Sequence, residues 1–425
     1  MSAGAHAAPG RRIATLLSVV LNAALAGAAC AGGSSAPADS ANSSWALNPT
    51  TEPAIAGPAT AHANLSASPS GVILSWVEQL GPTSRLWFSD RIEAGWSAPR
   101  QVASGTDWFV SYADPPQVMR RPNGSLVAAW LRQIDPRLEA SNLLVAHSED
   151  GGRTWSTPAS PHRDGTTQQH AFPSFFELAA GQLGVVWLDG REIELDQTSD
   201  AGGAMSLRAA TFDQQWQPQR ELAVDLRVCE CCPTAAAVTS EGPIVAYRGR
   251  SAGEVRNILV SRFQENAWTP PVTVHDDGWR TLACPVNGPT LVARDRVVVA
   301  AWFTVKDERG QALAAFSTDS GRTWGPPFRL DDGESLGRVD LELLDDGSVA
   351  ASWVGVVGGE ARLFVRRVQQ DGRLSPAIRV SDVPGGSSSG FPRMARWRQQ
   401  LIFAWTESDA STGTTRVRTA SAGLP

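Results

Sequence analysis

A short apolar segment that ends in an aromatic residue recurs along the chain at a nearly constant interval. The aromatic residues are Trp76, Trp130, Trp187, Tyr247, Trp302, Trp353 and Trp405, at intervals of 54, 57, 60, 55, 51 and 52 residues. Each segment follows a polar or Gly-containing turn and an earlier apolar run, and an alternating segment such as 143–148 comes after it. A fourth segment often begins with Trp and leads to Pro, as at 96–99 and 268–271. Four short strands in each period are typical of a β-propeller blade.

The sequence therefore predicts an all-β propeller of four-stranded blades. Seven aromatic positions favour seven blades, with six as the alternative if the first or last unit is partial. The last unit ends before a fourth strand, and the segment Trp45–Pro49 resembles that missing strand. We expect it to pair with the C-terminal blade and close the ring, which removes open sheet edges. The repeated Trp residues are interpreted as packing between blades.

Composition excludes two classes of function. Charged residues make up 19% of the 425 residues, below the roughly 25% of an average globular protein, and 42% are hydrophobic, so the chain can build a large core. The net charge is −6, and the basic residues are scattered. We therefore expect no nucleic-acid partner and no binding to an anionic membrane surface.

The N-terminus has the pattern of an export signal. Arg11 and Arg12 precede an apolar run at 13–29 that ends in small residues, and Cys30 follows in a sequence resembling a bacterial lipoprotein processing site. Lipidation of Cys30 and simple cleavage with release are both open. The predicted domains are a signal peptide at 1–30, an Ala/Ser/Pro-rich tether with the closing strand at 31–58, and the propeller at 59–425. We expect an exported bacterial protein, periplasmic or lipid-anchored at the cell envelope, with a membrane contact only through that anchor.

Two turns between third and fourth strands share one motif. Residues 148–155 and 317–324 both read Ser-x-Asp-x-Gly-x-Thr-Trp, with Asp150 and Asp319 as the central carboxylates. This motif resembles the Asp-box of the sialidase-like (BNR-repeat) propellers, and the resemblance covers the chain from about residue 60. A short carboxylate that accepts backbone N–H bonds, with a Gly at positive φ, explains the turn. Asp150 and Asp319 are therefore predicted to be structural.

Polar residues cluster where the first strand of a blade starts and the second strand ends. These points share one face of a propeller, opposite the Asp-box turns, and we expect their side chains to converge on an axial mouth. The substrate-binding candidates are His170, Arg191, Arg248, Arg250, Asn287, Arg338 and Arg393, and the catalytic candidates are Asp114, Asp189 and Asp340. Arginine pairs bidentately with carboxylate, so the mouth suits an acidic or polyhydroxylated sugar.

The sialidase resemblance implies an arginine trio that holds the sialic-acid carboxylate, a Tyr–Glu nucleophile pair and an Asp acid. The chain departs from that pattern, because an Arg-Ile-Pro signature is missing near the first blade. Tyr112 and Tyr247 are the two tyrosines, and Tyr247 occupies a packing position. If the protein is an enzyme, the resemblance implies a glycoside hydrolase of exo-α-sialidase type.

Four cysteines beyond Cys30 form the most individual feature. Cys229, Cys231 and Cys232 lie within four residues, and Cys284 opens a Cys-Pro-Val-Asn-Gly-Pro segment in the next unit. The two segments resemble a subgroup of exported sialidase-like proteins. Two disulfides, a Cu(I) or Zn(II) site with His170 as a further ligand, and reactive thiols are the alternatives. Cys232–Cys284 is the favoured single disulfide.

Three functions are compatible with these features. The first is an exported, monomeric propeller that binds, and in its enzymatic form hydrolyses, an acidic or polyhydroxylated glycan. The second is a periplasmic Cu or Zn protein that uses the cysteines. The third is an interaction scaffold without a small ligand, since the fold alone does not determine function.

Overall fold

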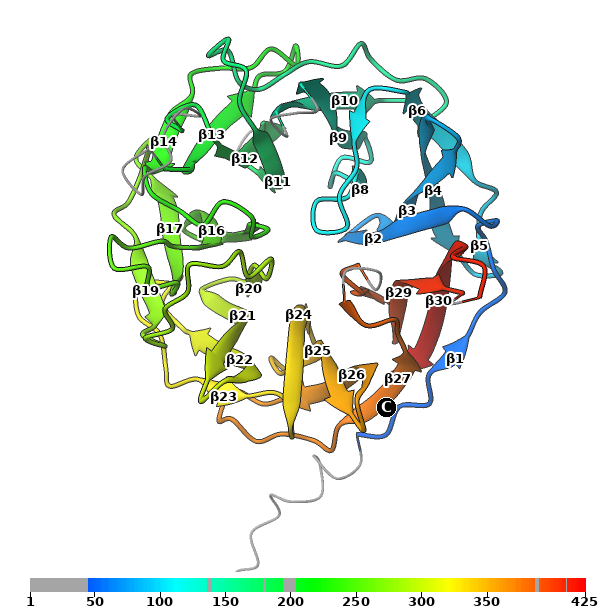
Figure 1. Ribbon diagram of the computed structural model, residues 1–425, viewed down its shortest axis with the longest axis vertical. Coiled ribbons are helices and arrows are strands. Elements are labelled where there is room, and N and C mark those ends of the chain that lie inside the picture. Colours follow the sequence, from blue (N-terminus) through cyan, green and yellow to red (C-terminus); the bar gives the residue numbers. More distant parts are fainter. Residues whose placement is uncertain (1–44, 136–139, 179–180, 194–203, 387–389, 410) are drawn as a thin grey trace, which may run out of the picture. The chain divides into compact units, whose positions relative to one another are not determined.

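The computed structural model describes residues 45–135, 140–178, 181–193, 204–386, 390–409 and 411–425. In the unit that spans Ser40–Pro425, seven antiparallel sheets surround a common axis (Figure 1). The prediction of a seven-bladed propeller is confirmed, and the six-bladed alternative is wrong. The predicted signal peptide, Cys30 and the tether up to residue 44 lie outside the described residues.

The first four blades follow one another along the chain. Blade 1 contains β2 (Thr60–Ser68), β3 (Gly71–Leu80), β4 (Thr83–Ile92), β5 (Gly95–Trp96) and β6 (Arg100–Gly105). Blade 2 contains β7 (Trp108–Phe109), β8 (Gln117–Arg120), β9 (Leu126–Asp135) and β10 (Ala140–Ser148). Blade 3 contains β11 (His170–Glu177), β12 (Leu183–Asp189), β13 (Ser206–Phe212) and β14 (Leu222–Asp225). Blade 4 contains β15 (Ala235–Thr239), β16 (Gly242–Arg248), β17 (Ile258–Gln264), β18 (Ala267–Trp268) and β19 (Val272–His275).

The last three blades complete the ring. Blade 5 contains β20 (Thr290–Arg294), β21 (Val297–Lys306), β22 (Arg309–Ser317) and β23 (Phe328–Arg329). Blade 6 contains β24 (Glu334–Leu343), β25 (Val349–Val357), β26 (Glu360–Val368) and β27 (Ile378–Asp382). Blade 7 contains β28 (Arg393–Trp397), β29 (Gln400–Ser408), β30 (Thr415–Gly423) and β1 (Thr50–Thr51). Figure 1 shows the first strands of the blades, such as β2, β11 and β24, nearest the axis.

The recurring aromatic residues all lie in second strands and are buried. Trp187, Tyr247 and Trp302 are fully buried, and the other four are at most 6% exposed. Second strands are covered by a neighbouring blade on both faces, so they are apolar along their length and do not alternate. All seven residues of β12 are buried. The interpretation of these aromatic residues as packing residues agrees with this burial.

The hydrophobic core is divided among the spaces between blades. The cluster around Trp302 joins β16 and β17 of blade 4 to β21 of blade 5. The clusters around Trp130, Trp353, Trp405 and Trp76 likewise each join two neighbouring blades. Each blade is therefore stabilised mainly by contact with its neighbours.

The N-terminal segment closes the ring. In β1, Thr50 pairs with Ser421 and Thr51 with Ala420 of β30. The predicted closing segment, Trp45–Pro49, comes just before this pairing and contributes packing, because Trp45 and Leu47 are buried between blades 6 and 7. Closure by an N-terminal strand is confirmed, with the paired residues shifted by a few positions.

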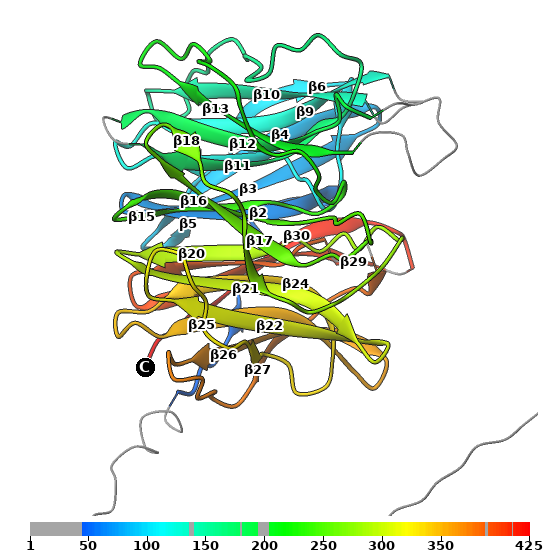
Figure 2. The same cartoon turned by 90° about the vertical axis from the view of Figure 1, so that its left-hand side faces the viewer.

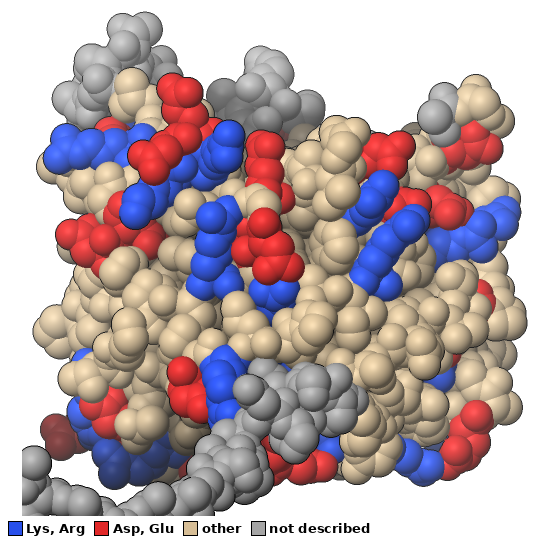
Figure 3. Space-filling view, turned by 90° about the horizontal axis from the view of Figure 1, so that it is seen from below, with Lys and Arg blue, Asp and Glu red and all other residues tan. Residues whose placement is uncertain are grey.

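The loops gather on two opposite faces of the ring, because the strands run roughly along its axis (Figure 2). On the side of the ring shown in Figure 3, acidic and basic side chains are interspersed, with uncharged residues between them. The described residues contain no helix that is long and apolar enough to cross a membrane.

Removal of the closing segment should destabilise the ring. A chain that begins at Pro53 lacks Trp45, Leu47 and β1, whereas a chain that begins at Trp45 keeps them. We expect the shorter chain to lose at least about 4 kcal/mol of unfolding free energy, since large core side chains cost about 3–5 kcal/mol each when removed. Chemical denaturation of both chains tests this, and equal stability would contradict the closing role of the segment.

Candidate functional site

The Asp-box turns form the hydrogen bonds that their sequence predicts. The Asp319 carboxylate accepts bonds from the backbone N–H groups of Arg322 (3.0 Å) and Thr323 (2.9 Å). It also accepts bonds from the hydroxyls of Ser317 (2.8 Å) and Thr323 (2.6 Å). Asp150 accepts the equivalent bonds in the first turn. Both carboxylates are thus engaged within their turns.

Three inner strands carry a bulge at which a residue other than glycine is left-handed. The residues are His62 in β2 (φ 60°), Phe172 in β11 (φ 56°) and Arg338 in β24 (φ 54°). Each lies where the pairing with the second strand shifts register. Bulges re-aim side chains next to functional sites, and left-handed residues with a Cβ are strained. Because such bulges recur in the first strands of three blades, we treat the region around the axis beside these bulges as a candidate site.

A cavity of about 250 Å³ is lined by the first strands and strand-one entries of six blades. The charged groups in its lining are Asp114 and Arg393, and the polar ones are hydroxyls and amides. The polar lining residues are Asn64, Ser66, Gln117, Ser174, Thr234 and Thr290. This composition suits a polyhydroxylated ligand, because hydroxyls and amides both donate and accept hydrogen bonds.

Two arginines lie against one aromatic ring beside this cavity. The guanidinium carbons of Arg338 and Arg393 are 5.7 and 5.9 Å from the ring centre of Phe391. The ring of Tyr112 stacks on Phe391 with centres 6.4 Å apart. We call Tyr112, Arg338, Phe391 and Arg393 the mouth cluster.

Among the described residues, the two arginines of the mouth cluster form no ion pair, although the charge of Arg393 acts on the nearby buried Asp340. Arg338 is only 8% exposed. Nη1 of Arg338 and Nε of Arg393 are buried without a hydrogen-bond partner among the described residues, while Nη2 of Arg338 donates to the carbonyl of Gly386. Burial lowers the pKa of Arg338. A guanidinium stays charged in proteins all the same, so Arg338 carries a positive charge that no ion pair balances within the described part of the chain.

The other predicted arginines are engaged within the fold. Arg191 pairs with Asp189 (2.7 Å) and Glu221 (2.7 Å). Arg248 is 1% exposed and donates to three backbone carbonyls, those of Asn287, Arg256 and Phe303. Arg250 pairs with Glu230 and Glu254. Convergence on an open mouth is therefore wrong for Arg191, Arg248 and Arg250, since these partners already use their donors.

His170 was also predicted to face the mouth, and the structure places it in a buried cluster instead. It is fully buried, with Nδ1 3.0 Å from the carbonyl of Ser141 and Nε2 2.9 Å from Asp164. The ring of His162 stacks on it at 3.6 Å. Burial lowers the pKa of His162 to about 4. The stacked rings and the ion pair of Asp164 with Arg191 indicate a structural role for this cluster.

The three candidate carboxylates differ in their access to the cavity. Asp114 lines it, and its carboxylate accepts a bond from the N–H of Phe172 (2.6 Å). Burial raises the pKa of Asp114 to about 7 despite that bond. Asp340 accepts bonds from the N–H of Met394 (2.8 Å) and the hydroxyl of Thr290 (3.3 Å), so it ties blades 5, 6 and 7 together. Asp189 is fully buried with Trp187 and Arg191 and shares no partner with Asp340.

The cysteines pair differently from the favoured prediction. The structure joins Cys231 to Cys284, with Cα atoms 6.1 Å apart, and leaves Cys229 and Cys232 as buried thiols. The favoured Cys232–Cys284 bridge is wrong, because Cys232 turns inward and its Sγ lies 3.2 Å from that of Cys229. With the disulfide formed, only two of the four sulfurs remain for a metal, and a structural zinc site needs four ligands.

Asn287 connects the cysteine segment with the mouth cluster. Its Oδ1 accepts a bond from the backbone N–H of Arg338 (3.0 Å), and its carbonyl accepts one from Arg248 (2.9 Å). Asn287 therefore supports the left-handed backbone of Arg338 through this hydrogen bond.

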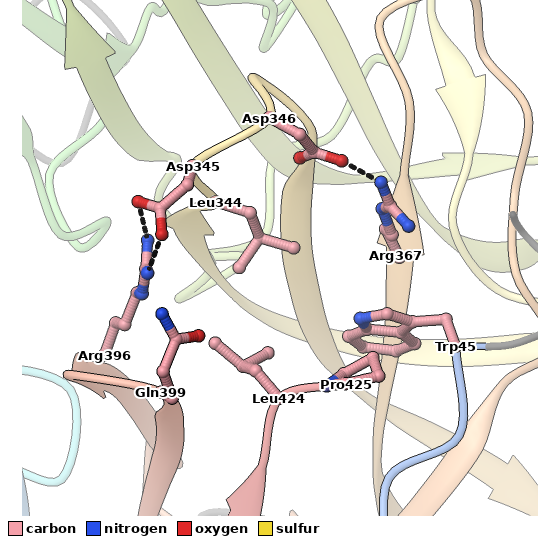
Figure 4. Close-up of a pocket in the computed structure, with 9 residues that line it drawn as sticks. All are labelled: Trp45, Leu344, Asp345, Asp346, Arg367, Arg396, Gln399, Leu424 and Pro425. Carbon is pink, nitrogen blue, oxygen red and sulfur yellow. Dashed lines mark hydrogen bonds and ion pairs between the residues drawn. The ribbon is translucent and has the colours of Figure 1, made fainter.

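A second pocket, of about 200 Å³, lies beside the closing segment (Figure 4). Here Arg396 pairs with Asp345 and Arg367 with Asp346. Leu344 and Trp45 supply apolar surface to the same pocket. Each arginine is neutralised by an aspartate, in contrast to the mouth cluster, so we assign this pocket no ligand.

Sequence reasoning did not select two aromatic residues that form the site. Phe391 packs against Tyr112, and the bulge residue Phe172 lines the cavity. Phe172 and Phe391 each precede a Pro at a strand-one start, so that recurrent dipeptide was the available signal. The burial of His162 and Asp164 had no comparable signal.

Similarity to known proteins is confined to the fold. No family model matches the chain, and no curated protein matches its sequence. A protein of unknown function from Dyadobacter fermentans has a TM-score of 0.50 at 14% identity, over 87% of this chain and 95% of that one. The polysaccharide lyase Uly1 has a TM-score of 0.50 at 10% identity, over 85% and 89% of the two chains. Trypanosoma rangeli sialidase in complex with the inhibitor DANA has a TM-score of 0.45 at 11% identity, over 78% and 57%.

This is a distant likeness to sialidase-type propellers. The polysaccharide lyase and the sialidase both act on glycans, yet identities of this size establish architecture only. The function of this chain must therefore be argued from its own site.

Asp319 should stabilise the protein above about pH 4 and cease to do so in acid. Burial raises its pKa, but the bonds from Thr323, Ser317 and Arg322 outweigh burial and lower the pKa from 3.8 to about 2. Its stabilisation is thus present above pH 3.8 and is lost as pH falls toward 2. We expect Asp319→Asn to cost about 1 kcal/mol at pH 7 and progressively less between pH 4 and 2, as measured by denaturation. A difference that does not change with pH would contradict this role.

Proposed function

We propose that the axial mouth binds an acidic glycan, whose carboxylate is held by Arg338 and Arg393. The observation that carries the proposal is the pair of arginines against Phe391, which form no ion pair among the described residues and have donors without partners. Arg393 has the buried Asp340 nearby, so Arg338 is the member of the pair whose charge has no acidic neighbour there. A buried charge without a counter-charge is costly, so such a residue is retained where a ligand supplies the anion. We place this binding outside the cytoplasm, on the basis of the predicted export segment.

Three features of the mouth favour a sugar acid over a simple anion. The donors of Arg338 and Arg393 that lack partners suit the two oxygens of a carboxylate. Phe391 and Tyr112 provide an aromatic surface between the arginines and the loop of blade 2. The adjoining cavity offers hydroxyls and amides for sugar hydroxyls. A sugar acid carries a carboxylate next to a polyhydroxylated ring, so it can contact the arginines, the aromatic surface and the polar cavity at the same time.

Hydrolysis is the activity to test at the same site. Asp114 has a pKa of about 7, so it holds a proton near neutral pH, as a general acid requires. A tyrosine nucleophile needs an adjacent base, and among the described side chains no carboxylate makes a hydrogen bond to Tyr112. We therefore propose binding as the function and exo-α-sialidase-type hydrolysis as an activity to be assayed with it.

Loss of either mouth arginine should weaken glycan binding. We expect Arg338→Ala and Arg393→Ala each to raise the Kd of a sialylated or uronic-acid oligosaccharide at least about tenfold, since a hydrogen bond to a charged group contributes about 1.5–3 kcal/mol. Calorimetric titration measures this. Arg153→Ala, in an Asp-box turn, is the matched control, and a neutral oligosaccharide of the same length is the ligand control.

Unchanged affinity in both mouth variants, with normal melting temperatures, would overturn the proposal. An absence of binding to any acidic or neutral oligosaccharide by the unmutated protein would do the same, and would favour the scaffold hypothesis.

Binding of an acidic glycan should weaken as pH rises through 7. Burial keeps Asp114 protonated below its pKa of about 7, and above that pH its negative charge opposes the carboxylate of the ligand. We expect the Kd to rise between pH 6 and 8 in the unmutated protein and to stay nearly constant in Asp114→Asn. Identical pH profiles for the two proteins would show that Asp114 does not face the ligand.

A further inference from the structure

Four sulfur atoms meet where the segments that lead into blades 4 and 5 come together, and the proposed glycan site uses none of them. Cys229 Sγ lies 3.2 Å from Cys232 Sγ and 3.9 Å from Cys231 Sγ. Cys231 is bonded to Cys284. Cys229 is thus in contact with both a free thiol and a disulfide sulfur, which is the arrangement that thiol–disulfide exchange requires.

The two sulfur pairs differ in their exposure. Cys229 and Cys232 are 1% and 2% exposed, whereas Cys284 is exposed on a loop next to Leu282, which is 81% exposed. The buried pair has the Cys-x-x-Cys spacing typical of dithiols that cycle between reduced and oxidised states. A reagent from solution would reach Cys284 first. The buried pair can exchange electrons with that reagent through the Cys231–Cys284 disulfide.

The surroundings of Cys229 favour its thiolate. Its hydrogen bond with Cys232 lowers the pKa of Cys229 to about 6 despite burial, with smaller contributions from the backbone N–H of Cys231 and from the charges of Arg248 and Arg256. Burial raises the pKa of Cys232 well above its usual value. Within the buried pair, Cys229 is therefore the nucleophile and Cys232 holds the proton.

We propose that the four cysteines form a thiol–disulfide exchange site, in which the exposed Cys231–Cys284 disulfide and the buried Cys229/Cys232 dithiol exchange two electrons. In the first step, the Cys229 thiolate attacks Cys231 Sγ, forms a Cys229–Cys231 bond and releases Cys284 as a thiolate. The proton of Cys232 passes to the released thiolate. In the second step, Cys232 attacks Cys229 Sγ, forms the Cys229–Cys232 bond and releases Cys231. Cys229 and Cys232 are then oxidised to a disulfide, and Cys231 and Cys284, the outer pair, are reduced. The protein as a whole neither gains nor loses electrons.

The outer pair is the point of contact with a substrate. A dithiol of a partner protein or small molecule would attack the exposed disulfide at Cys284, become a disulfide itself, and leave Cys231 and Cys284 as thiols. Exposed Leu282 beside Cys284 offers apolar contact to such a partner. The substrate class is therefore an accessible dithiol, for which dithiothreitol is the probe.

Peptide connectivity reports the exchange directly. Trypsin cleaves after Arg227, Arg248, Arg280 and Arg294, so the Cys231–Cys284 bond links peptides 228–248 and 281–294. Exchange separates them and places the disulfide inside peptide 228–248. The unmutated protein is equilibrated with graded, limiting dithiothreitol, quenched with acid, alkylated and analysed by mass spectrometry. We expect linked peptides, together with unlinked peptides that carry an internal Cys229–Cys232 bond.

Two variants isolate the role of Cys229. In Cys232→Ser, the first step still occurs and the second cannot, so unlinked peptides with a Cys229–Cys231 bond should accumulate. In Cys229→Ser, neither step occurs and the peptides should stay linked. We expect the unlinked fraction in Cys232→Ser to exceed that in Cys229→Ser at least about tenfold. Equal melting temperatures of the folded variants serve as the control, and the unmutated protein provides the decisive measurement if a variant does not fold.

Two results would overturn the proposal. One is that Cys231–Cys284 is the only disulfide found at every dithiothreitol concentration that reduces this bond in part of the protein molecules. Cys229 and Cys232 would then be found only as alkylated thiols. The other is a protein whose four cysteines are all reduced and bind about one equivalent of copper or zinc by elemental analysis, which would make the cluster a metal site.

Discussion

Apolar contact between neighbouring blades is the interaction on which the whole structure depends. Within the described part of the chain no blade has a core of its own, because the clusters around the second-strand aromatic residues each bury side chains from at least two blades. A blade in isolation would expose both faces of its sheet. The energy that holds any one blade is therefore available only when the next blade is in place, which makes the stability of the ring collective. Trp302 and Trp353, fully or almost fully buried at such contacts, show how closely the repeat is tied to this requirement.

The axial site follows from the same geometry. Seven sheets that pack by their faces leave their inner edges around the axis, where no neighbouring blade covers them. The bulges at His62, Phe172 and Arg338 interrupt regular pairing at this edge, and Phe172 lines the cavity. Arg338 keeps its strained backbone because Asn287, from the entry to blade 5, bonds to its N–H group. Contacts between blades therefore hold the residues of the mouth in position.

The repeat made the fold predictable from sequence. One aromatic residue in each second strand, such as Trp187 or Tyr247, favoured seven blades, and the two Asp-box turns indicated the third-to-fourth strand connections of blades 2 and 5. The site was less predictable, since placing residues at strand ends says nothing about their partners. Arg248 ends a second strand and Arg338 lies in a first strand, and both were predicted to face the mouth. In the structure, Arg248 donates to three backbone carbonyls, whereas Arg338 forms no ion pair among the described residues. His170 is buried by His162 and Asp164, which reach it from a loop without a repeating pattern. The pairing of Cys231 depends on how a tight segment turns, which spacing alone does not determine.

The closing strand has a consequence for how the protein is made. Thr50 and Thr51 of β1 are synthesised long before their partners Ser421 and Ala420 in β30. Contacts so distant in sequence form slowly, because the entropy of closing such a long loop must be overcome before they stabilise anything. Until β30 emerges, β1 and the face of blade 1 that packs against blade 7 have no partner. The time between the synthesis of the first and last blades is therefore the period in which the chain is most exposed to aggregation and proteolysis.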